Sequence, residues 1–410
     1  MRIAALALAV LPAPVAAQSC TAPVCNLEVL APYFARLAAP KGEGAPPVHI
    51  LQIGDSHTAG DAITGAWRDL LQAKSGGGGR GVLPPGRPYE GYLTRGVTAT
   101  MSSGWAIGAT FGKGSIAPRP PLGLSGFSLT SLRAGASMAL RTTPAMAFDR
   151  FVLCAIGGPQ AGSVIVRFDD GGQSNIDFNT LKSRPICQEI VAPRPHSFVE
   201  ITVDRPALTI TSWAGFRAAG GIALSNLGVV GSQLAHFART DDAVMAEELR
   251  AYKPDLIVLA FGTNEGFAPH FDPVAFEAVL RSQVTRLRLL SGGVPMLLLG
   301  APDALSRQAP LRANAPGALI GCEPSGDRPA LFAPPALAAV RAIQRRVAAE
   351  LGLAYWDWQA RMGGPCSARA WVQRADPLMR GDYVHFTTAG GLEIARRLQA
   401  DLDQGAAIAE

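Results

Sequence analysis

The order of apolar and polar positions predicts strands that alternate with helices in two parts of the chain. Near the N-terminus, the largely apolar segment 48–53 predicts a buried strand, and 62–73, with Trp67 and Leu71 at helical spacing, predicts a helix. The alternation resumes with strands at 224–230, 255–260, 296–300 and 353–356 and helices at 242–252, 274–290, 336–350 and 388–402. This alternation is typical of a parallel sheet covered by helices on both faces.

A different pattern separates these two parts. Between residues 98 and 212, short apolar runs alternate with turn residues, as where 163–168 meets the turn 169–172. No helical pattern stands between these runs, so they predict β-hairpins. The glycine- and proline-rich stretch 76–86 predicts a loop. We therefore expect one α/β domain, formed by 18–97 and 213–410, with a β-rich, sandwich-like module at 98–212 inserted after its first strand and helix.

The first 17 residues are expected to be a signal peptide. Arg2 precedes an apolar run over 3–11, and the small residues Val15 and Ala17 fit cleavage after position 17. Acylation of Cys20 in a lipoprotein is the alternative. No other stretch reaches 18 continuous apolar residues, so we expect no integral membrane segment once the signal peptide is removed.

Composition excludes two classes of protein. The chain is 48% hydrophobic and 17% charged, which indicates a folded rather than a disordered chain. Its 37 basic residues exceed its 32 acidic residues by five, but the basic residues are scattered singly along the sequence. We therefore do not expect nucleic acid as a partner. The oligomeric state stays open.

All six cysteines follow the expected cleavage site. An even number in an exported chain predicts disulfides, although six cysteines allow 15 pairings. We favour nearest neighbours, because each pair then falls within one segment, and keep free buried cysteines as the alternative. These pairs are Cys20–Cys25, Cys154–Cys187 and Cys322–Cys366. Cysteine and histidine do not cluster at metal-ligand spacing, so no metal and no other cofactor is expected.

Polar residues follow the predicted strands at three places. Ser56 follows the first strand, Asn264 follows the strand at 255–260, and Asp382 and His385 precede the last helix. Because catalytic groups gather beyond the carboxyl ends of parallel strands, we expect these residues to lie together. They suit a nucleophile, an oxyanion donor, and a base with its orienting carboxylate. Taken alone, the first of these motifs would favour a simpler interpretation, in which Asp55 or Ser56 merely caps the helix.

These motifs resemble the SGNH, or GDSL-type, hydrolase superfamily. Gly54-Asp55-Ser56 matches the first block of the family, Gly262-Thr263-Asn264-Glu265 the third, and Asp382-Tyr383-Val384-His385 the fifth, in family order. The second block is similar around Gly231, with Gly228 as the alternative glycine. The resemblance implies a flavodoxin-like, three-layer α/β fold.

The resemblance also implies a mechanism for a carboxylic ester hydrolase. Ser56 attacks an ester carbonyl, His385 takes and then returns the proton, and Asp382 orients His385. The backbone N–H groups of Ser56 and Gly231 and the amide of Asn264 hold the oxyanion. The family's usual aspartate after the asparagine is a glutamate here, which lies outside this catalytic set, so we still expect activity.

The inserted module points to one group of enzymes within this superfamily. Ser56 and Gly231 are 175 residues apart, far more than one helix and one strand need, and the β-rich module fills the gap. This layout, with Gly-Asp-Ser-His-Thr-Ala-Gly-Asp at 54–61, resembles bacterial peptidoglycan O-acetylesterases, in which the module is similar to a carbohydrate-binding domain. It implies a periplasmic or extracellular enzyme that acts on an O-acetylated polysaccharide, here the acetyl ester of muramic acid.

Three residues are weaker predictions for sugar contacts, and other functions stay open. His57 lies beside the nucleophile, and Trp105 and Trp213 lie near the edges of the module, although core tryptophans are the simpler interpretation of the last two. A polysaccharide O-acetyltransferase, a lipase or a thioesterase would use the same triad. A non-catalytic glycan-binding protein is a further alternative, which the joint presence of Ser56, Asp382 and His385 disfavours.

Overall fold

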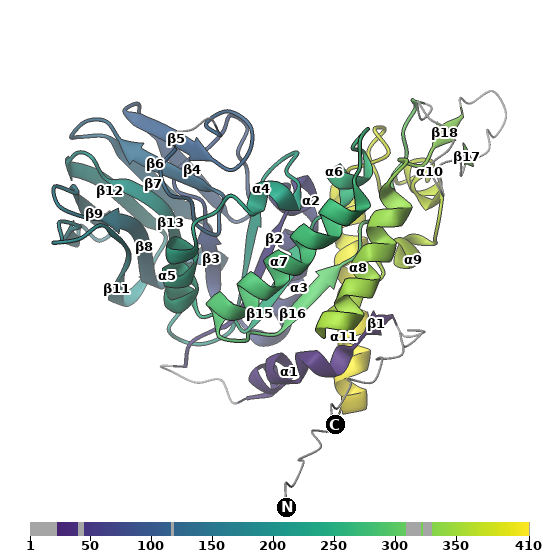
Figure 1. Cartoon of the computed structure of the whole chain (residues 1–410). Coiled ribbons are helices and arrows are strands. Elements are labelled where there is room, and N and C mark those ends of the chain that lie inside the picture. Colours follow the sequence, from purple (N-terminus) through teal and green to yellow (C-terminus); the bar gives the residue numbers. More distant parts are fainter. Residues whose placement is uncertain (1–22, 40–44, 116–118, 309–320, 323–329, 410) are drawn as a thin grey trace, which may run out of the picture.

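The computed structural model describes residues 23–39, 45–115, 119–308, 321–322 and 330–409, which form a helix-covered sheet joined to a β-rich part (Figure 1). The expected signal peptide and Cys20 lie outside the described residues. Among the helices that the structure describes, none is both long and apolar enough to span a bilayer.

A six-stranded sheet forms the centre of the first part. Its order is β1-β19-β16-β15-β2-β14, and all neighbours are parallel except β1, which pairs antiparallel with β19. The strands are β1 (Val24–Cys25), β2 (Val48–Gly54), β14 (Ile222–Gly228), β15 (Leu256–Ala260), β16 (Met296–Leu299) and β19 (Ala354–Trp356). The five parallel strands follow the flavodoxin-like order 2-1-3-4-5, so the topological switch point lies between β2 and β15. The expected three-layer α/β fold is confirmed.

Helices cover both faces of this sheet. The first face carries α1 (Ala31–Ala38), α3 (Ala62–Ser75) and α11 (Thr388–Ala409), and the second carries α5 (Asp242–Tyr252), α7 (Pro273–Ser291) and α8 (Leu337–Leu351). The shorter helices are η1 (Leu27–Leu30), α2 (Ser56–Ala59), α4 (Leu234–Phe237), α6 (Thr263–Gly266), α9 (Trp358–Met362) and α10 (Ser367–Val372). A small β-pair, β17 (Gly321–Cys322) with β18 (Leu331–Phe332), lies beside α10.

Capping residues that can be recognised in the sequence mark the ends of two long helices. Asp241 caps α5, because its carboxylate accepts hydrogen bonds from the second and third helical N–H groups. Asp272 caps α7 in the same way, Pro273 occupies its first position, and Gly292 ends it with φ at 71°. These caps explain why the predicted bounds of both helices agree with the structure to within a residue.

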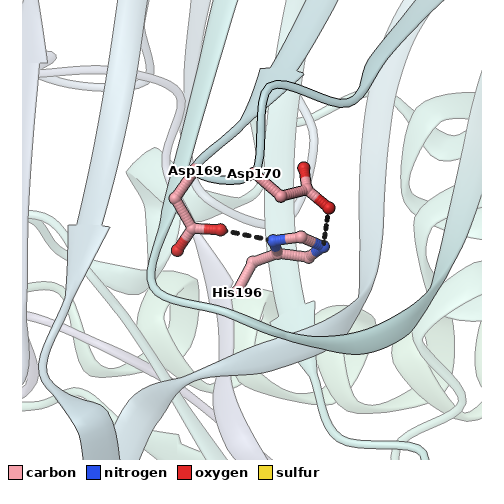
Figure 2. Close-up of side chains that lie close together, drawn as sticks. All are labelled: Asp169, Asp170 and His196. Carbon is pink, nitrogen blue, oxygen red and sulfur yellow. Dashed lines mark hydrogen bonds and ion pairs between the residues drawn. The ribbon is translucent and has the colours of Figure 1, made fainter.

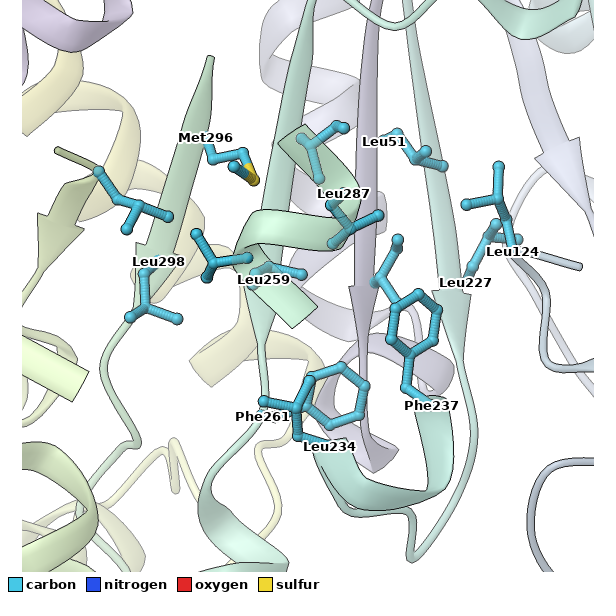
Figure 3. Packing of buried hydrophobic residues seen from close by; sticks show 14 of the residues in the cluster. Leu51, Leu124, Leu227, Leu234, Phe237, Leu259, Phe261, Leu287, Met296 and Leu298 are labelled. Atoms are coloured by element: carbon cyan, nitrogen blue, oxygen red, sulfur yellow. The ribbon is translucent and has the colours of Figure 1, made fainter. Parts of the chain in front are cut away.

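Each face of the sheet has its own apolar core. Consecutive β2 residues point to opposite faces: Ile50 belongs to the core under α3, and Leu51 to the core under α7. Figure 3 shows the second core, in which Leu259 and Leu298 of the strands lie close to Leu287 of α7. The strands β15 and β16 are buried on both faces and read as continuous apolar runs in the sequence, whereas β2 also buries the polar residues His49 and Gln52.

Two antiparallel sheets make up the β-rich part. One has the order β10-β9-β12-β7-β4, and the other has β11-β8-β13-β6-β5 with β3 also paired to β13. The strands are β3 (Gly79–Leu83), β4 (Val97–Met101), β5 (Trp105–Ala109), β6 (Phe127–Ser131), β7 (Ser137–Thr142), β8 (Phe148–Gly157), β9 (Ser163–Phe168), β10 (Gln173–Asp177), β11 (Arg184–His196), β12 (Phe198–Arg205) and β13 (Thr209–Phe216); the 3₁₀ turn η2 spans Pro144–Met146. Apolar residues from both sheets form a third core between them.

The prediction of a loop over 76–86 is wrong, because β3 lies within it. Glycine is needed in this strand: a Cβ on Gly79 would lie 2.5 Å from the carbonyl oxygen of Gly215, and one on Gly81 would lie 2.4 Å from Ser225 Oγ. Both glycines also have positive φ, 92° and 79°. Here glycine marks the close approach of two strands and a bulge rather than a loop. The domain division stays a prediction, and β3 extends the β-rich part beyond its expected start.

The β-rich part shares a core with the helix-covered sheet. Val152 of β8 and Phe216 of β13 belong to the same buried cluster as Met245 of α5 and Ile257 of β15. Gly77, which precedes β3, also forms an isolated β-bridge with Ile222 of β14. The two parts are therefore joined by side-chain packing as well as by the chain.

Two of the predicted disulfides are present. Cys154–Cys187 joins β8 to β11, and Cys322–Cys366 joins β17 to the start of α10. Cys25 is also disulfide-bonded, and its predicted partner Cys20 lies outside the described residues. The two described pairs are the nearest-neighbour pairs that the sequence favoured.

Candidate active site

Ser56 stands at the switch point of the parallel sheet, at the start of α2. Gly54 ends β2 in close contact with its neighbours: a Cβ there would lie 2.3 Å from Thr58 Oγ1 and 2.5 Å from the carbonyl oxygen of Ala260. The chain turns at Asp55, whose carboxylate caps α2 by accepting a hydrogen bond from the His57 N–H at 2.9 Å. Asp55, rather than Ser56, is therefore the helix cap, which leaves the Ser56 hydroxyl for other contacts.

His385 and Asp382 reach Ser56 from the turn before α11. Ser56 Oγ lies 3.0 Å from His385 Nε2, and His385 Nδ1 lies 2.8 Å from Asp382 Oδ2. A carboxylate only accepts hydrogen bonds, so Nδ1 carries the ring proton and Nε2 is free to accept from the serine. The structure thus brings together the three residues that the sequence predicted as a nucleophile, a base and an orienting carboxylate.

The turn itself holds Asp382 in its ionised form. Asp382 Oδ1 accepts hydrogen bonds from the backbone N–H groups of Val384 at 2.9 Å and His385 at 3.0 Å. Burial raises the pKa of Asp382, but these two hydrogen bonds and the one from the His385 ring outweigh burial, so the pKa lies below its ordinary value. Tyr383, which follows Asp382 in this turn, has the positive φ of 60° that the tight turn requires.

Gly231 and Asn264 lie in two loops that touch each other. Asn264 Nδ2 donates to the carbonyl oxygen of Ser232 at 2.9 Å, and Gln233 Nε2 donates to the carbonyl oxygen of Asn264 at 3.2 Å. The Gly231 N–H donates to no acceptor among the described residues, and its φ of 76° favours glycine. The alternative, Gly228, is packed under α2, where a Cβ would lie 2.2 Å from the Ala59 nitrogen.

Glu265 connects these two loops. Its side chain is buried, and Oε1 accepts a hydrogen bond from the Leu234 N–H at 2.7 Å. Burial raises its pKa to about 7. The glutamate that departs from the family pattern therefore has a positioning contact, because it ties α6 to the loop that carries Gly231.

His57 lines the same cleft as Ser56 and His385, but both of its ring nitrogens are engaged by the protein. The residue is 6% exposed; its Nε2 lies 3.0 Å from the carbonyl oxygen of Val384, and its Nδ1 lies 3.2 Å from Asp55 Oδ1. Burial lowers the pKa of His57, but the Asp55 carboxylate and the Val384 carbonyl outweigh it and raise the pKa. Both ring nitrogens face protein acceptors, so this ring holds the His385 turn and offers no nitrogen to a sugar.

A buried charge network lies beneath the nucleophile turn. Asp61 accepts hydrogen bonds from Arg68 at 2.9 Å and from Arg80 at 3.4 Å, and the side chains of all three are 0% exposed. Both guanidinium groups also donate to the Asn226 side-chain oxygen, and Asn226 Nδ2 donates to the Thr58 carbonyl at 3.0 Å. This network was missed by the sequence analysis. It joins β3 and β14 to the helix that begins at Ser56.

Ser56 and His385 open into a cleft of about 400 Å³. Segments from both parts of the molecule line it: Ile63 of α3, Tyr89 and Leu93 from the connection between β3 and β4, and Val230 from the loop after β14. Leu93 is 79% exposed and Val230 55% exposed. The cleft therefore combines exposed apolar side chains with the side chains of Ser56 and His385.

Neither predicted tryptophan lines this cleft. Trp213 is 0% exposed in the core between the two β-sheets, so its prediction as a sugar contact is wrong. Trp105 is half-buried against the same core, and its Nε1 donates to the Ser137 carbonyl at 3.2 Å. Large aromatic rings at hairpin positions serve core packing here.

A second group of titratable side chains lies far from the cleft, at the turn between β9 and β10 and the end of β11 (Figure 2). His196 Nδ1 lies 2.5 Å from Asp169 Oδ1, and its Nε2 lies 3.9 Å from Asp170 Oδ2. The ligand atoms of the three residues fall within 4.8 Å of one another, a spacing that metal sites also use. In this structure the hydrogen bond between His196 and Asp169 fastens the turn to β11.

Comparison with known proteins adds the family. Residues 202–391 match the GDSL-like Lipase/Acylhydrolase family. The chain carries a GDSL-like acylhydrolase domain. The matched range begins within β12, so it contains Gly231, Asn264, Asp382 and His385 but not Ser56. Ser56 lies outside the matched range, but its hydroxyl is within hydrogen-bond distance of His385, which lies inside it.

One solved structure is similar over nearly the whole chain. A structure of a peptidoglycan O-acetylesterase is similar with a TM-score of 0.71 and 26% identity, over 94% of this chain and 97% of that chain. The acetyl xylan esterase AlAXEase (19% identity, TM-score 0.29, 44% of this chain and 80% of that chain) and a putative GDSL-like lipase from Parabacteroides merdae (16%, 0.31, 45% and 74%) are too distant to support an argument. No curated protein matches the chain. With its GDSL-like domain, the chain is a carboxylic ester hydrolase.

Proposed function

We propose that this GDSL-like protein is an exported serine esterase that removes O-acetyl groups from peptidoglycan. The observation that carries the proposal is the hydrogen-bonded series from Ser56 through His385 to Asp382 at the base of an open cleft. Its polymer is inferred from the 26% identity, over nearly the whole chain, to a protein described as a peptidoglycan O-acetylesterase.

The proposed reaction has two halves. Ser56 Oγ forms a bond to the acetyl carbonyl carbon while His385 Nε2 takes the hydroxyl proton, and that proton then passes to the sugar oxygen as it leaves. Water attacks the acetyl-serine by the same route in reverse and releases acetate. Asp382 keeps the His385 ring in the tautomer that accepts the proton, and it stabilises the imidazolium that forms.

Three donors are assigned to the developing oxyanion. The Ser56 N–H belongs to the first turn of α2, where helix amides have no intrahelical acceptor. The Gly231 N–H is the second donor. The third is the hydrogen of Asn264 Nδ2 that does not bond Ser232. Each such donor typically contributes about 100- to 1,000-fold to the rate.

We also propose that the protein is exported, to the periplasm or beyond the cell. Disulfides persist in oxidising compartments, and two fall on predicted pairs. The β-rich part is proposed as a glycan-binding module. Its support is the contribution of Tyr89 and Leu93, from the β3–β4 connection, to the cleft beside Ser56.

Acetate release from intact polymers tests the proposed substrate. The enzyme should release acetate from O-acetylated peptidoglycan faster, per acetyl group, than from O-acetylated xylan, because the muramic ester matches the inferred site. Chemically deacetylated peptidoglycan provides the blank for free acetate. Faster release from xylan would contradict the choice of polymer while leaving the esterase assignment intact.

Acyl chain length provides a second prediction. A pocket shaped for acetyl has little room for further methylenes, each of which apolar pockets discriminate by about 1–3 kcal/mol. We expect kcat/KM on p-nitrophenyl esters to fall at least about tenfold from acetyl to butyryl. Initial rates across a series from acetate to octanoate measure this. A maximum at hexanoate or longer would favour a lipase or thioesterase instead.

A further inference from the structure

Arg380 lies at the edge of the cleft beside His385, and its charge is not used by the fold. It is exposed and lines the cleft together with Ser56 and His385. Its guanidinium has no hydrogen bond or ion pair to any of the residues that the structure describes. Most arginines near it are engaged: Arg307 donates to the Gly381 carbonyl at 3.0 Å, and Arg397 pairs with Glu393.

The backbone fixes Arg380 relative to the catalytic ring. Its N–H donates to the His385 carbonyl at 2.7 Å, and its own carbonyl accepts from the Tyr383 N–H at 3.0 Å. These two hydrogen bonds close the turn that carries Asp382 and His385. A group held by this guanidinium therefore sits at a set place relative to the ester that Ser56 attacks.

The other residues along the cleft leave this charge uncompensated. The described lining contains no aspartate or glutamate, and Arg380 is its sole arginine or lysine. Around it stand apolar or aromatic side chains, among them Tyr89, Leu93 and Val230, which suit the face of a sugar ring. An exposed guanidinium in a cleft that no acidic side chain lines is complementary to a carboxylate, which it can bind through two parallel hydrogen bonds.

We propose that Arg380 determines substrate choice by binding a free carboxylate on the same sugar that carries the acetyl ester. The proposal rests on the proposed function and names its substrate class: an acidic acetylated sugar rather than a neutral one. Muramic acid fits where no stem peptide is attached, because its lactyl carboxyl group is then a free carboxylate on the same sugar as the acetylated hydroxyl. Glucosamine acetylated at the same position lacks that carboxyl group.

The test compares two sugars that differ only in the acid. Wild-type enzyme should have a higher kcat/KM on 6-O-acetyl-N-acetylmuramic acid than on 6-O-acetyl-N-acetylglucosamine. Arg380→Gln should reduce this ratio about tenfold, and Arg380→Lys should reduce it less, because lysine keeps the charge but not the planar fork. Added salt should lower the wild-type ratio, because the site is exposed. Arg374→Gln is the matched control, since Arg374 is an exposed arginine outside the cleft.

The outcomes separate this proposal from the function on which it rests. Hydrolysis of both sugars by wild type with equal kcat/KM, or an unchanged ratio in Arg380→Gln, would overturn the role of Arg380 and leave the sugar esterase standing. Turnover of p-nitrophenyl acetate with neither sugar hydrolysed would overturn both. A loss of the ratio in the Arg374→Gln control as well would also contradict the role of Arg380, because surface charge in general would then set the preference.

Discussion

Ser56→Ala should lower kcat on p-nitrophenyl acetate by roughly a million-fold, the scale seen when a serine nucleophile is removed from a working triad. Alanine removes the oxygen that lies 3.0 Å from His385 Nε2, so no bond to the acyl carbon can form. Residual turnover would come from oxyanion donors and binding alone. Steady-state release of p-nitrophenol measures the effect.

The control is a serine without a role in the cleft. Ser183→Ala removes an exposed hydroxyl from the β-rich part and should leave the rate at the wild-type value. Matching circular dichroism and melting temperature of the Ser56→Ala protein would establish that it folds. If the folded variant kept more than about a tenth of the rate, Ser56 would not be the nucleophile.

Asp61→Ala should destabilise the folded protein by about 3–5 kcal/mol, the usual result of removing one partner from a buried ion pair. The change leaves the guanidinium groups of Arg68 and Arg80 in the interior without their carboxylate. Burial already lowers the pKa of Arg80 to about 10, which reflects how unfavourable that charge is there. Urea unfolding, followed by fluorescence, gives the free energy of unfolding.

A neighbouring aspartate offers a matched control. Asp69 pairs with Arg95 at 2.6 Å, but both side chains are about half exposed. Asp69→Ala should therefore change the free energy of unfolding by about 0–1 kcal/mol, as exposed pairs do. Equal effects of the two substitutions would contradict the view that the Asp61 network is a main support of the nucleophile turn.

Much of the α/β domain could be predicted because its signals are local. The strand Leu256–Ala260 is apolar throughout, Asp241 and Asp272 cap their helices, and the strand ends carry the polar residues of the site. Parallel strands then bring those ends to one edge, so Ser56 and His385 meet as the motif order implied.

The features that were missed depend on distant contacts. The glycines of β3 read as a loop, since their close approach to Gly215 and Ser225 is invisible in the sequence. Nothing in the sequence indicates that Arg68 and Arg80 are buried, since only the fold brings Asp61 to both of them. The core position of Trp213, which the sequence favoured over a sugar contact, depends on the two β-sheets that enclose it.

The distance along the chain between Ser56 and His385 makes activity a late product of folding. These residues are 329 positions apart, and every parallel strand of the sheet except β2 lies between them. Contacts of such long range form after local ones, because the loop they close must first be ordered. A growing polypeptide therefore exposes its nucleophile long before it has a base. Hydrolysis begins only when the segment before α11 has docked, so the enzyme stays inert throughout its own synthesis.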